Sequence, residues 1–390
     1  MYMLRIKALE IQNINSISNL SLKFSDGLNI LCGTNGVGKT TILECIAGVI
    51  RGKMNVRTSV TCSNGKIGII VKQDEDYFEE KVSIDAEQII LEKEALSTEL
   101  IFYNTSHRSS SRHVSRDYDV DRPPMSPLDA VKRWLYRNYI ESNEISSIKQ
   151  SNFELVRECI NKIDNNVYFE DLLLSYRNRE MGPKKTIHTY RTVEFLIKTP
   201  HGTMDINYLS SGYKACFTIL IDLIRQLELT MNEAVEEYQG IVLIDEIDLH
   251  LHPEWQTRIT SIIKWLVPKA QIIVTTHSPH VIQSANAGEI IPLGIDETNN
   301  IYVRNLPKSY MYGYQGWNVE EILVHVMGLE DPMSKVFREK LEKFEIGLSE
   351  ENKDKVIEAY NALNAMLHNR NPLLALIKIQ ASEYLEEDEE

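Results

Sequence analysis

Apolar side chains follow two patterns along the chain, and each pattern predicts a different kind of β-strand. Segments 4–11 and 20–24 alternate apolar and polar residues, which is typical of strands with one buried face. Segments 28–32, 240–244 and 272–274 are almost unbroken apolar runs. Such runs predict strands that are buried on both faces of a parallel sheet. Further strands are expected at 66–72, 82–92, 99–103, 190–198, 289–293 and 300–304.

Helical spacing of apolar residues predicts helices between and after these strands. Segments 41–50 and 215–229 show this spacing, and the region 128–175 is also expected to be helical. Segment 105–127 is rich in Ser, Arg, Asp and Pro and has no periodic apolar pattern. The C-terminal helices are expected at 316–327, 337–344, 354–367 and 372–379.

These patterns predict four segments. An N-terminal lobe (1–104) is followed by a helical, partly basic insertion (105–188). A second lobe (189–305) completes the predicted α/β core, and a helical region (306–390) ends the chain. The insertion has no sustained heptad repeat, so it does not predict a long coiled-coil arm.

The composition is that of an ordinary soluble globular protein. Of 390 residues, 43% are hydrophobic and 25% are charged, and no run reaches the roughly 18 apolar residues of a membrane span. The N-terminus reads directly as a strand rather than as a signal peptide. An odd number of cysteines without C-x-x-C spacing favours reduced thiols and a cytoplasmic location. The cysteines are Cys32, Cys45, Cys62, Cys159 and Cys216.

The chain is acidic overall, with a formal net charge of −14 and a pI of about 5.3. This balance does not suit a protein that coats nucleic acid through its bulk charge. Two stretches of the insertion are nevertheless locally basic. They contain Arg108, Arg112, Arg116, Arg122, Lys132, Arg133 and Arg137, and then Arg177, Arg179, Lys184, Lys185 and Arg191. The sequence leaves two interpretations open: contacts to a DNA phosphate backbone, or solvated loops and intersubunit salt bridges.

Residues 33–40, Gly-Thr-Asn-Gly-Val-Gly-Lys-Thr, match the phosphate-loop pattern G-x-x-x-x-G-K-[ST]. A predicted strand precedes them and a predicted helix follows, which is the context that the pattern requires. Glycines let backbone N–H groups wrap phosphates, and the helix N-terminus favours the anion. ATP is therefore the expected ligand. The predicted nucleotide-binding residues of this loop are Gly33, Asn35, Gly36, Gly38, Lys39, Thr40 and Thr41.

Two carboxylates at the end of the apolar run 240–244 complete the predicted site. Asp245 is expected to hold Mg²⁺ through water, together with the Thr40 hydroxyl. Lys39 is expected to reach the β- and γ-phosphates. Glu246 is then free to polarise the attacking water as a general base. These residues predict ATP hydrolysis, but they do not indicate how fast it is.

Three further motifs resemble those of ABC-type ATPases. Segment 208–214, Tyr-Leu-Ser-Ser-Gly-Tyr-Lys, resembles the L-S-G-G-Q signature, with Ser211 and Tyr213 departing from the transporter form. Segment 240–253 resembles the extended Walker B motif and D-loop of the non-transporter branch, and 272–279 resembles its switch-histidine strand. The order of the motifs is also that of ABC proteins. The resemblance implies an α/β fold: an ABC-type, SMC- or RecF-like P-loop ATPase head.

The same resemblance implies a head-to-tail homodimer that closes around ATP. Ser210, Ser211 and Gly212 of one subunit would contact the ATP of the other, because the first N–H groups of a helix are spare donors. His277 would donate a hydrogen bond to the γ-phosphate. The alternative for His277 is a structural histidine in the core.

A segment that senses Mg²⁺ and γ-phosphate is expected after the strand at 99–103. Residues 103–108, Tyr-Asn-Thr-Ser-His-Arg, have this position but include no glutamine, and Gln73 is the alternative. His250 and His252 could suggest a metal site. Because no third ligand is evident, we assign them to packing and to the D-loop.

Nearly the whole chain resembles the PtuA-type ATPases of the Septu antiphage defence system and their retron-associated relatives. The discriminating segments are 103–108, 209–214, 245–256, 316–323 and 371–374. The resemblance implies a multimeric regulatory ATPase that controls a separate HNH nuclease partner of the PtuB type. The alternative is a RecF- or SMC-like repair ATPase that clamps DNA directly. A third interpretation is that ATP is held structurally with little turnover.

The C-terminal region predicts no nuclease site of its own. A two-metal nuclease needs clustered carboxylates at strand ends. Residues 300–390 contain neither the strands nor such a cluster in a strand context. Any DNA cleavage is therefore expected from a partner.

Overall fold

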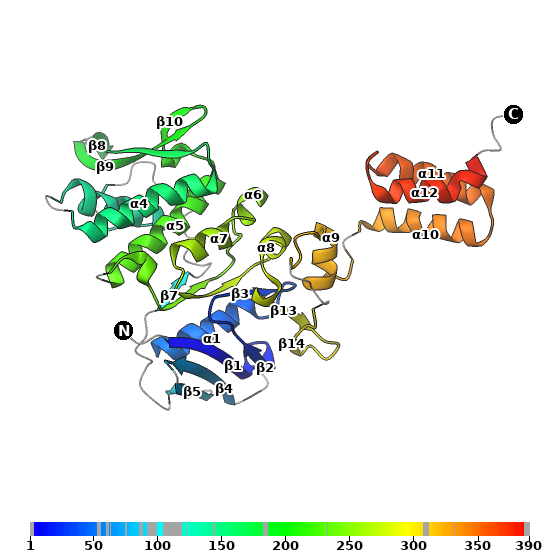
Figure 1. Ribbon diagram of the computed structural model, residues 1–390, viewed down its shortest axis with the longest axis horizontal. Helices are drawn as coiled ribbons and strands as arrows, with labels where there is room; N and C mark the ends of the chain where they lie inside the picture. Colours follow the sequence, from blue (N-terminus) through cyan, green and yellow to red (C-terminus); the bar gives the residue numbers. More distant parts are fainter. Residues whose placement is uncertain are drawn as a thin grey trace. The chain divides into compact units, whose positions relative to one another are not determined.

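The computed structural model describes most of the chain. The described residues are 4–52, 56–59, 62, 64–74, 76–85, 89–91, 100–103, 119–121, 123–142, 145–181, 186–231, 233–306, 312–331 and 333–385. The chain divides into two compact units, Met1–Leu329 and Glu330–Glu390 (Figure 1). The larger unit contains every residue of the predicted ATP site.

A mixed sheet forms the centre of the larger unit, with the strand order β14-β13-β3-β12-β11-β7. Its strands are β3 (Leu28–Cys32), β7 (Leu100–Tyr103), β11 (Ile241–Ile244), β12 (Gln271–Thr275), β13 (Ile290–Ile295) and β14 (Ile301–Val303). All neighbours are parallel except the β13–β14 pair. The carboxyl ends of β3, β12 and β11 therefore meet at one edge, where open α/β sheets bind ligands.

The unbroken apolar runs are explained by two cores, one on each face of this sheet. In β11, Ile241 and Leu243 enter one core, while Val242 and Ile244 enter the other. Successive side chains of a strand point to opposite faces, so a strand covered on both sides needs apolar residues throughout. The predicted buried strands at 28–32, 240–244 and 272–274 are confirmed.

A second, antiparallel sheet covers one face of the parallel sheet, with helix α1 (Lys39–Arg51) in the core between them. Its order is β2-β1-β4-β5-β6. The strands are β1 (Leu4–Ile14), β2 (Ile17–Lys23), β4 (Asn64–Gln73), β5 (Asp76–Asp85) and β6 (Ile89–Leu91). The single strand expected at 82–92 is wrong. Val82 pairs antiparallel with Leu91, so this segment folds back on itself as part of a hairpin.

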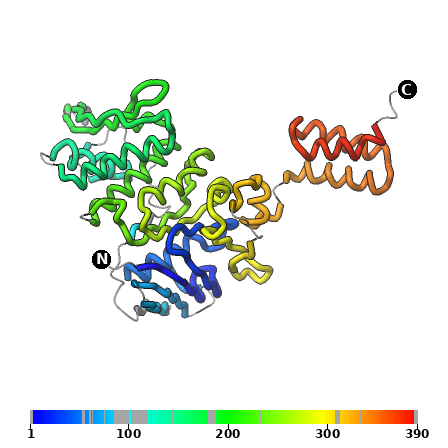
Figure 2. Tube along the Cα trace, in the orientation of Figure 1, coloured from blue at the N-terminus to red at the C-terminus, as the bar shows by residue number. Residues whose placement is uncertain are grey.

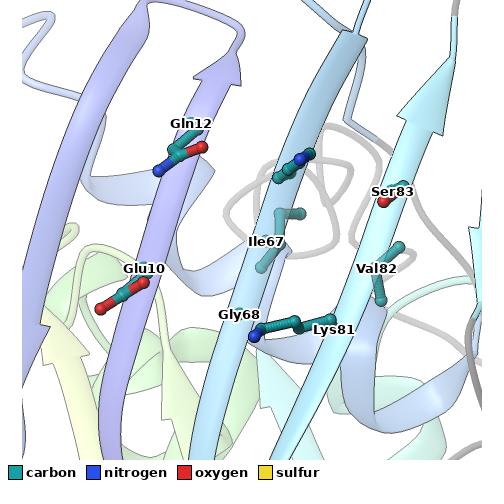
Figure 3. Close-up of a pocket in the computed structure, with 8 residues that line it drawn as sticks. Glu10, Gln12, Ile67, Gly68, Lys81, Val82 and Ser83 are labelled. Atoms are coloured by element: carbon teal, nitrogen blue, oxygen red, sulfur yellow. The ribbon is translucent and has the colours of Figure 1, made fainter.

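The outer face of the antiparallel sheet carries a polar hollow of about 290 Å³ (Figure 3). It runs across β1, β4 and β5, where Gly68 leaves space between longer side chains. It is lined by Glu10, Gln12, Lys66, Ile67, Gly68, Lys81, Val82 and Ser83. None of these residues belongs to the phosphate loop or to the ends of β11 and β12.

Helices cover the other face of the parallel sheet. They are α5 (Ser211–Thr230), α6 (Pro253–Gln256), α7 (Ile259–Leu266) and α8 (Pro279–Ser284). Helix α5 confirms the helix expected at 215–229, and Ser210 caps it by accepting a hydrogen bond from the Tyr213 N–H. Short 3-10 turns join the elements at Ile206–Tyr208, Val235–Glu237 and Ala287–Glu289.

The expected insertion is partly helical. Helices α3 (Pro127–Leu135) and α4 (Ser147–Ile163) pack against α5, beside it in Figure 2, and a π-helix, η2 (Tyr136–Ile140), continues α3. The expectation of helix up to residue 175 is wrong. Strand β8 (Tyr168–Met181) pairs with β9 (Thr186–Thr199), and β9 pairs with β10 (Gly202–Asp205).

The strand predicted at 190–198 therefore belongs to a separate three-stranded sheet, β10-β9-β8, rather than to the ATPase sheet. Pairing with β9 decides the structure of 168–175, because the three consecutive leucines Leu172 to Leu174 do not by themselves separate a helix from a strand. The helices α3 and α4 and this sheet are built around shared core residues such as Phe195 and Ile197.

The expected C-terminal helical region is divided between the two units. Residues 312–329, with α9 (Val319–Glu321) and the π-helix η6 (Ile322–Val326), pack on the larger unit through Tyr314 and Val326. The smaller unit consists of α10 (Lys335–Ser349), α11 (Lys353–Met366) and α12 (Pro372–Leu385) around its own core, which includes Phe344 and Leu363 (Figure 1). In the described part of the chain, no helix combines the length and apolar character needed to cross a membrane.

Candidate nucleotide-binding site

The phosphate loop leaves β3 and enters α1 through three glycines with positive φ. The φ angles of Gly33, Gly36 and Gly38 are 144°, 84° and 78°. Side chains rarely adopt these conformations. At Gly33 a Cβ would also lie 2.4 Å from the carbonyl oxygen of Leu293 on β13. The loop can therefore approach β13 closely only because residue 33 is glycine.

Lys39 places a buried cation inside this loop. Its side chain is 6% exposed, and its Nζ donates to the carbonyl oxygens of Gly33 and Thr34, both at 3.0 Å. Burial lowers the pKa of Lys39, and the nearby carboxylates of Asp245 and Asp248 act against this effect. The ammonium group is thus held where backbone N–H groups of the loop can share an anion with it.

The hydroxyl of Thr40 joins the phosphate loop to the end of β11. Thr40 Oγ1 lies 3.1 Å from both Oδ1 and Oδ2 of Asp245. Asp245 is only 1% exposed. A hydroxyl and a carboxylate are oxygen donors of the kind that Mg²⁺ takes, so these residues fit the ion. The structure brings together two residues that are 205 positions apart in the sequence.

Glu246 lies directly after Asp245 in an unusual backbone conformation. Its φ is +48°, in the left-handed region, and its N–H donates to the hydroxyl of Thr275 at 2.7 Å. Non-glycine residues in this region are uncommon and persist where the surroundings hold them. The turn directs the chain away from β11 immediately after the two carboxylates.

His277 follows β12 at the same edge of the sheet. Its N–H and the hydroxyl of Thr276 both donate to Oδ1 of Asp248, at 3.2 and 2.6 Å. Burial lowers the pKa of His277, and the neighbouring Lys39 lowers it further. The imidazole is therefore neutral at pH 7 and can donate one ring hydrogen bond. His277 is partly buried at this edge of the sheet.

Asn35 and Thr41 have different surroundings within the loop. Asn35 is exposed at its tip. The hydroxyl of Thr41 accepts a hydrogen bond of 3.2 Å from Nδ2 of Asn15, in the turn between β1 and β2. The start of α1 is thereby tied to the antiparallel sheet.

The signature residues lie on a different part of the protomer. Ser210 and Ser211 are exposed at the start of α5. At Gly212 a Cβ would lie 2.7 Å from the ring of Trp255 and 3.2 Å from the carbonyl oxygen of His250. Among the described residues, no hydrogen bond joins positions 210–212 to the phosphate loop. The structure thus gathers the phosphate loop, Asp245, Glu246 and His277 in one place and leaves the signature apart from them.

Comparisons with known proteins agree with this geometry. The family model described as "AAA domain, putative AbiEii toxin, Type IV TA system" matches residues 28–283. The "Septu protein PtuA" of Bacillus thuringiensis is 36% identical over 409 aligned residues, covering 98% of this chain and 99% of that protein.

The chain belongs to the PtuA family.

Two further similarities fit this membership. The "Retron Ec83 probable ATPase" of Escherichia coli is 31% identical over 150 residues, which cover 38% of this chain and 27% of that protein. Among solved structures, an SMC head bound to the C-terminal winged-helix domain of ScpA has a TM-score of 0.50 at 16% identity. It covers 77% of this chain and 96% of its own. The predicted fold class, an α/β head of the SMC type, is confirmed.

The segment expected to sense γ-phosphate lies mostly outside the described residues. Tyr103 ends β7 beside β11, and 104–108 follow without description. The alternative, Gln73, is contradicted. It pairs with Leu4, and the neighbouring Arg5 donates to the carbonyls of Gln239 and Lys269, just before β11 and β12 begin. Gln73 is therefore at the opposite edge of the sheet from the phosphate loop.

The insertion's described basic residues are largely paired with carboxylates of the same protomer. Lys132 is 2% exposed and lies 3.1 Å from Asp205, so its interpretation as a DNA contact is wrong. Arg177 lies 2.8 Å from Glu194, and Arg191 pairs with Asp121. Arg133 and Arg137 form no ion pair with another residue in the described part of the chain. Arg108, Arg112, Arg116, Arg122, Lys184, Lys185 and the side chain of Arg179 lie outside the description.

Several residues that organise the site were not predicted from the sequence. Thr275, Thr276 and Asp248 hold the ends of β11 and β12 together. Gln256 extends this network, since its Oε1 accepts from the Ser278 hydroxyl at 2.6 Å and its Nε2 donates to the Leu251 carbonyl. The sequence signal that could have identified them is the pair of threonines, Thr275 and Thr276, that follows the apolar run 272–274. His252 caps α6 by accepting the Glu254 N–H at its Nδ1, whereas His250 is exposed, which does not fit the packing role expected for it.

Proposed function

We propose that this chain is an ATP-binding and ATP-hydrolysing regulatory subunit of an antiphage defence complex, located in the cytoplasm. The observation that carries the proposal is the contact between Thr40 and Asp245, which joins the phosphate loop to the strand-end carboxylates. Membership of the PtuA family supports the defence role. In this proposal the subunit dimerises around ATP and controls a separate HNH-type nuclease.

Each chemical role falls to a residue already placed at the carboxyl edge of the sheet. The loop glycines and Lys39 bind the phosphates, and Thr40 with Asp245 holds Mg²⁺, which neutralises phosphate charge when bound. Glu246 takes a proton from the attacking water, and His277 donates to the γ-phosphate. Lys39 can bind the phosphates without a second protomer, because its ammonium group already lies inside the loop.

Dimerisation is proposed from the exposed start of α5. The first N–H groups of a 20-residue helix are available at Ser211 and Gly212, and neither Ser210 nor Ser211 is covered by its own protomer. Close packing of Gly212 on Trp255 sets the position of this helix start. A head-to-tail partner would bring these donors to the other protomer's ATP.

Replacing Ser210 with arginine is expected to lower ATP hydrolysis at least about 10-fold while leaving ATP binding by the monomer unchanged. A bulky cation at the helix start would obstruct the partner's ATP, whereas the monomer's own phosphate loop is untouched. Steady-state phosphate release and equilibrium binding of a fluorescent ATP analogue measure the two effects.

Ser146→Arg is the matched control. Ser146 is also exposed and also caps a helix, α4, by accepting from the Lys149 N–H. It shares the loss of a cap but not the proposed interface, so its hydrolysis rate should stay near wild type. Full activity of Ser210→Arg would contradict the trans arrangement.

Control of a nuclease is tested by co-expressing the chain with a candidate HNH protein from its genomic neighbourhood. We expect the two to co-purify and DNA cleavage to change when ATP is added. A lone dimer that binds DNA only with ATP, in a salt-sensitive manner, would instead support the DNA-clamp alternative.

A further inference from the structure

Thr275, the last residue of β12, is bonded to both carboxylate-bearing residues at the end of β11. Its side chain is fully buried. Its Oγ1 donates to Oδ1 of Asp245 at 2.8 Å and accepts the N–H of Glu246 at 2.7 Å. A single hydroxyl thus uses its one proton on the first residue and its lone pair on the second.

The bond to Asp245 fixes the carboxylate that faces the phosphate loop. Asp245 is almost completely buried, and its two oxygens lie at equal distances from the Thr40 hydroxyl. A carboxylate can rotate about its terminal bond, which has only a broad torsional preference. The donor on Thr275 selects the rotation in which both oxygens face Thr40.

The bond to Glu246 holds an unfavourable backbone turn. Glu246 has its φ at +48°, a conformation that needs support from its surroundings. Thr275 supplies two supports: its hydroxyl accepts the N–H of Glu246, and its carbonyl accepts the N–H of Ile247 at 2.9 Å. The direction in which the Glu246 side chain leaves the strand depends on this turn.

Fold requirements alone do not explain a hydroxyl at this position. The three preceding residues of β12, Ile272, Ile273 and Val274, are all buried and apolar. Valine has nearly the shape of threonine and would continue this pattern. A buried hydroxyl is costly unless its hydrogen bonds are made, and here both are made to Asp245 and Glu246.

We propose that Thr275 is a positioning residue for ATP hydrolysis, acting through Asp245 and Glu246. This inference rests on the proposed ATPase function. One side chain sets the orientation of the metal-holding carboxylate and the direction of the general base. It therefore links the Mg²⁺ requirement of the site to its turnover.

The test compares Thr275→Val, which deletes only the hydroxyl, with Thr275→Ser, which keeps it. For Thr275→Val we expect kcat to fall about 10–100-fold and the Mg²⁺ concentration for half-maximal rate to rise about 10-fold. ATP binding in the absence of Mg²⁺ should stay within about 3-fold of wild type, while the gain in affinity on adding Mg²⁺ shrinks. Thr275→Ser should recover kcat and the Mg²⁺ dependence.

Thr260→Val is the matched control, because Thr260 is a buried threonine on α7 outside the site. Its kcat and Mg²⁺ dependence should match wild type. Wild-type protein that binds no ATP would overturn the proposed function and this inference with it. If the wild-type protein binds ATP and Thr275→Val has the same kcat and the same Mg²⁺ dependence as wild type, the inference alone is overturned. Failure of Thr275→Ser to restore activity would also contradict it.

Discussion

Replacing Lys39 with alanine is expected to weaken ATP binding by at least about 100-fold. Each charge-assisted hydrogen bond to a phosphate contributes roughly 1.5–3 kcal/mol, and the ammonium group can make two or more. In the structure Lys39 is buried, and among the described residues its Nζ donates to two carbonyl oxygens of its own loop, those of Gly33 and Thr34. Isothermal titration of ATP into the purified variant measures the loss.

Lys23→Ala is a suitable control for this experiment. Lys23 is an exposed lysine at the end of β2, and its removal changes the net charge by the same amount. Its ATP affinity should remain at the wild-type value, and thermal melting should show both variants folded. ATP affinity retained by Lys39→Ala would contradict the assignment of residues 33–40 as the phosphate loop.

Replacing Glu246 with glutamine is expected to lower kcat by about 100–10,000-fold without loss of ATP binding. This range is what a positioned general base typically contributes. Glutamine keeps the length of the side chain but cannot take a proton from water. The ATP-bound dimer should therefore accumulate, which size-exclusion chromatography with light scattering detects in the presence of ATP and Mg²⁺.

Glu236→Gln provides the comparison, since Glu236 is exposed on a 3-10 turn before β11. It should hydrolyse ATP at the wild-type rate and show no ATP-stabilised dimer beyond wild type. If Glu246→Gln turns over ATP normally, another group takes the proton and Glu246 has no role as base.

The central strands and the phosphate loop were predictable because their signals are local. The run at 240–244 is apolar at every position, and such a run followed by Asp245 and Glu246 has few structural interpretations. The glycines of 33–38 carry their own explanation, since the loop requires positive φ at Gly33, Gly36 and Gly38. Local sequence therefore specified both halves of the site.

The β8–β9 hairpin and the Thr275 bridge could not be predicted in the same way. Residues 168–175 have side chains that suit either a helix or a strand, and pairing with β9 determines the outcome. Thr275 looks like any threonine in a strand until β11 is placed beside it. Lys132 reads as a surface cation, yet its partner Asp205 lies 73 residues further along the chain.

Subunit mixing tests most directly whether each ATP is shared between two protomers. Lys39→Ala lacks a working phosphate loop, and Ser210→Arg lacks a working signature, so each variant alone should have little ATPase activity. In a 1:1 mixture with random pairing, half of the dimers are mixed, and each mixed dimer has one intact site made from both chains. We predict recovery of about one quarter of the wild-type ATPase rate. The rate per Ser210→Arg protomer should rise further when Lys39→Ala is added in excess, because more Ser210→Arg protomers then pair with Lys39→Ala. A mixture that stays inactive at every ratio would contradict the shared site.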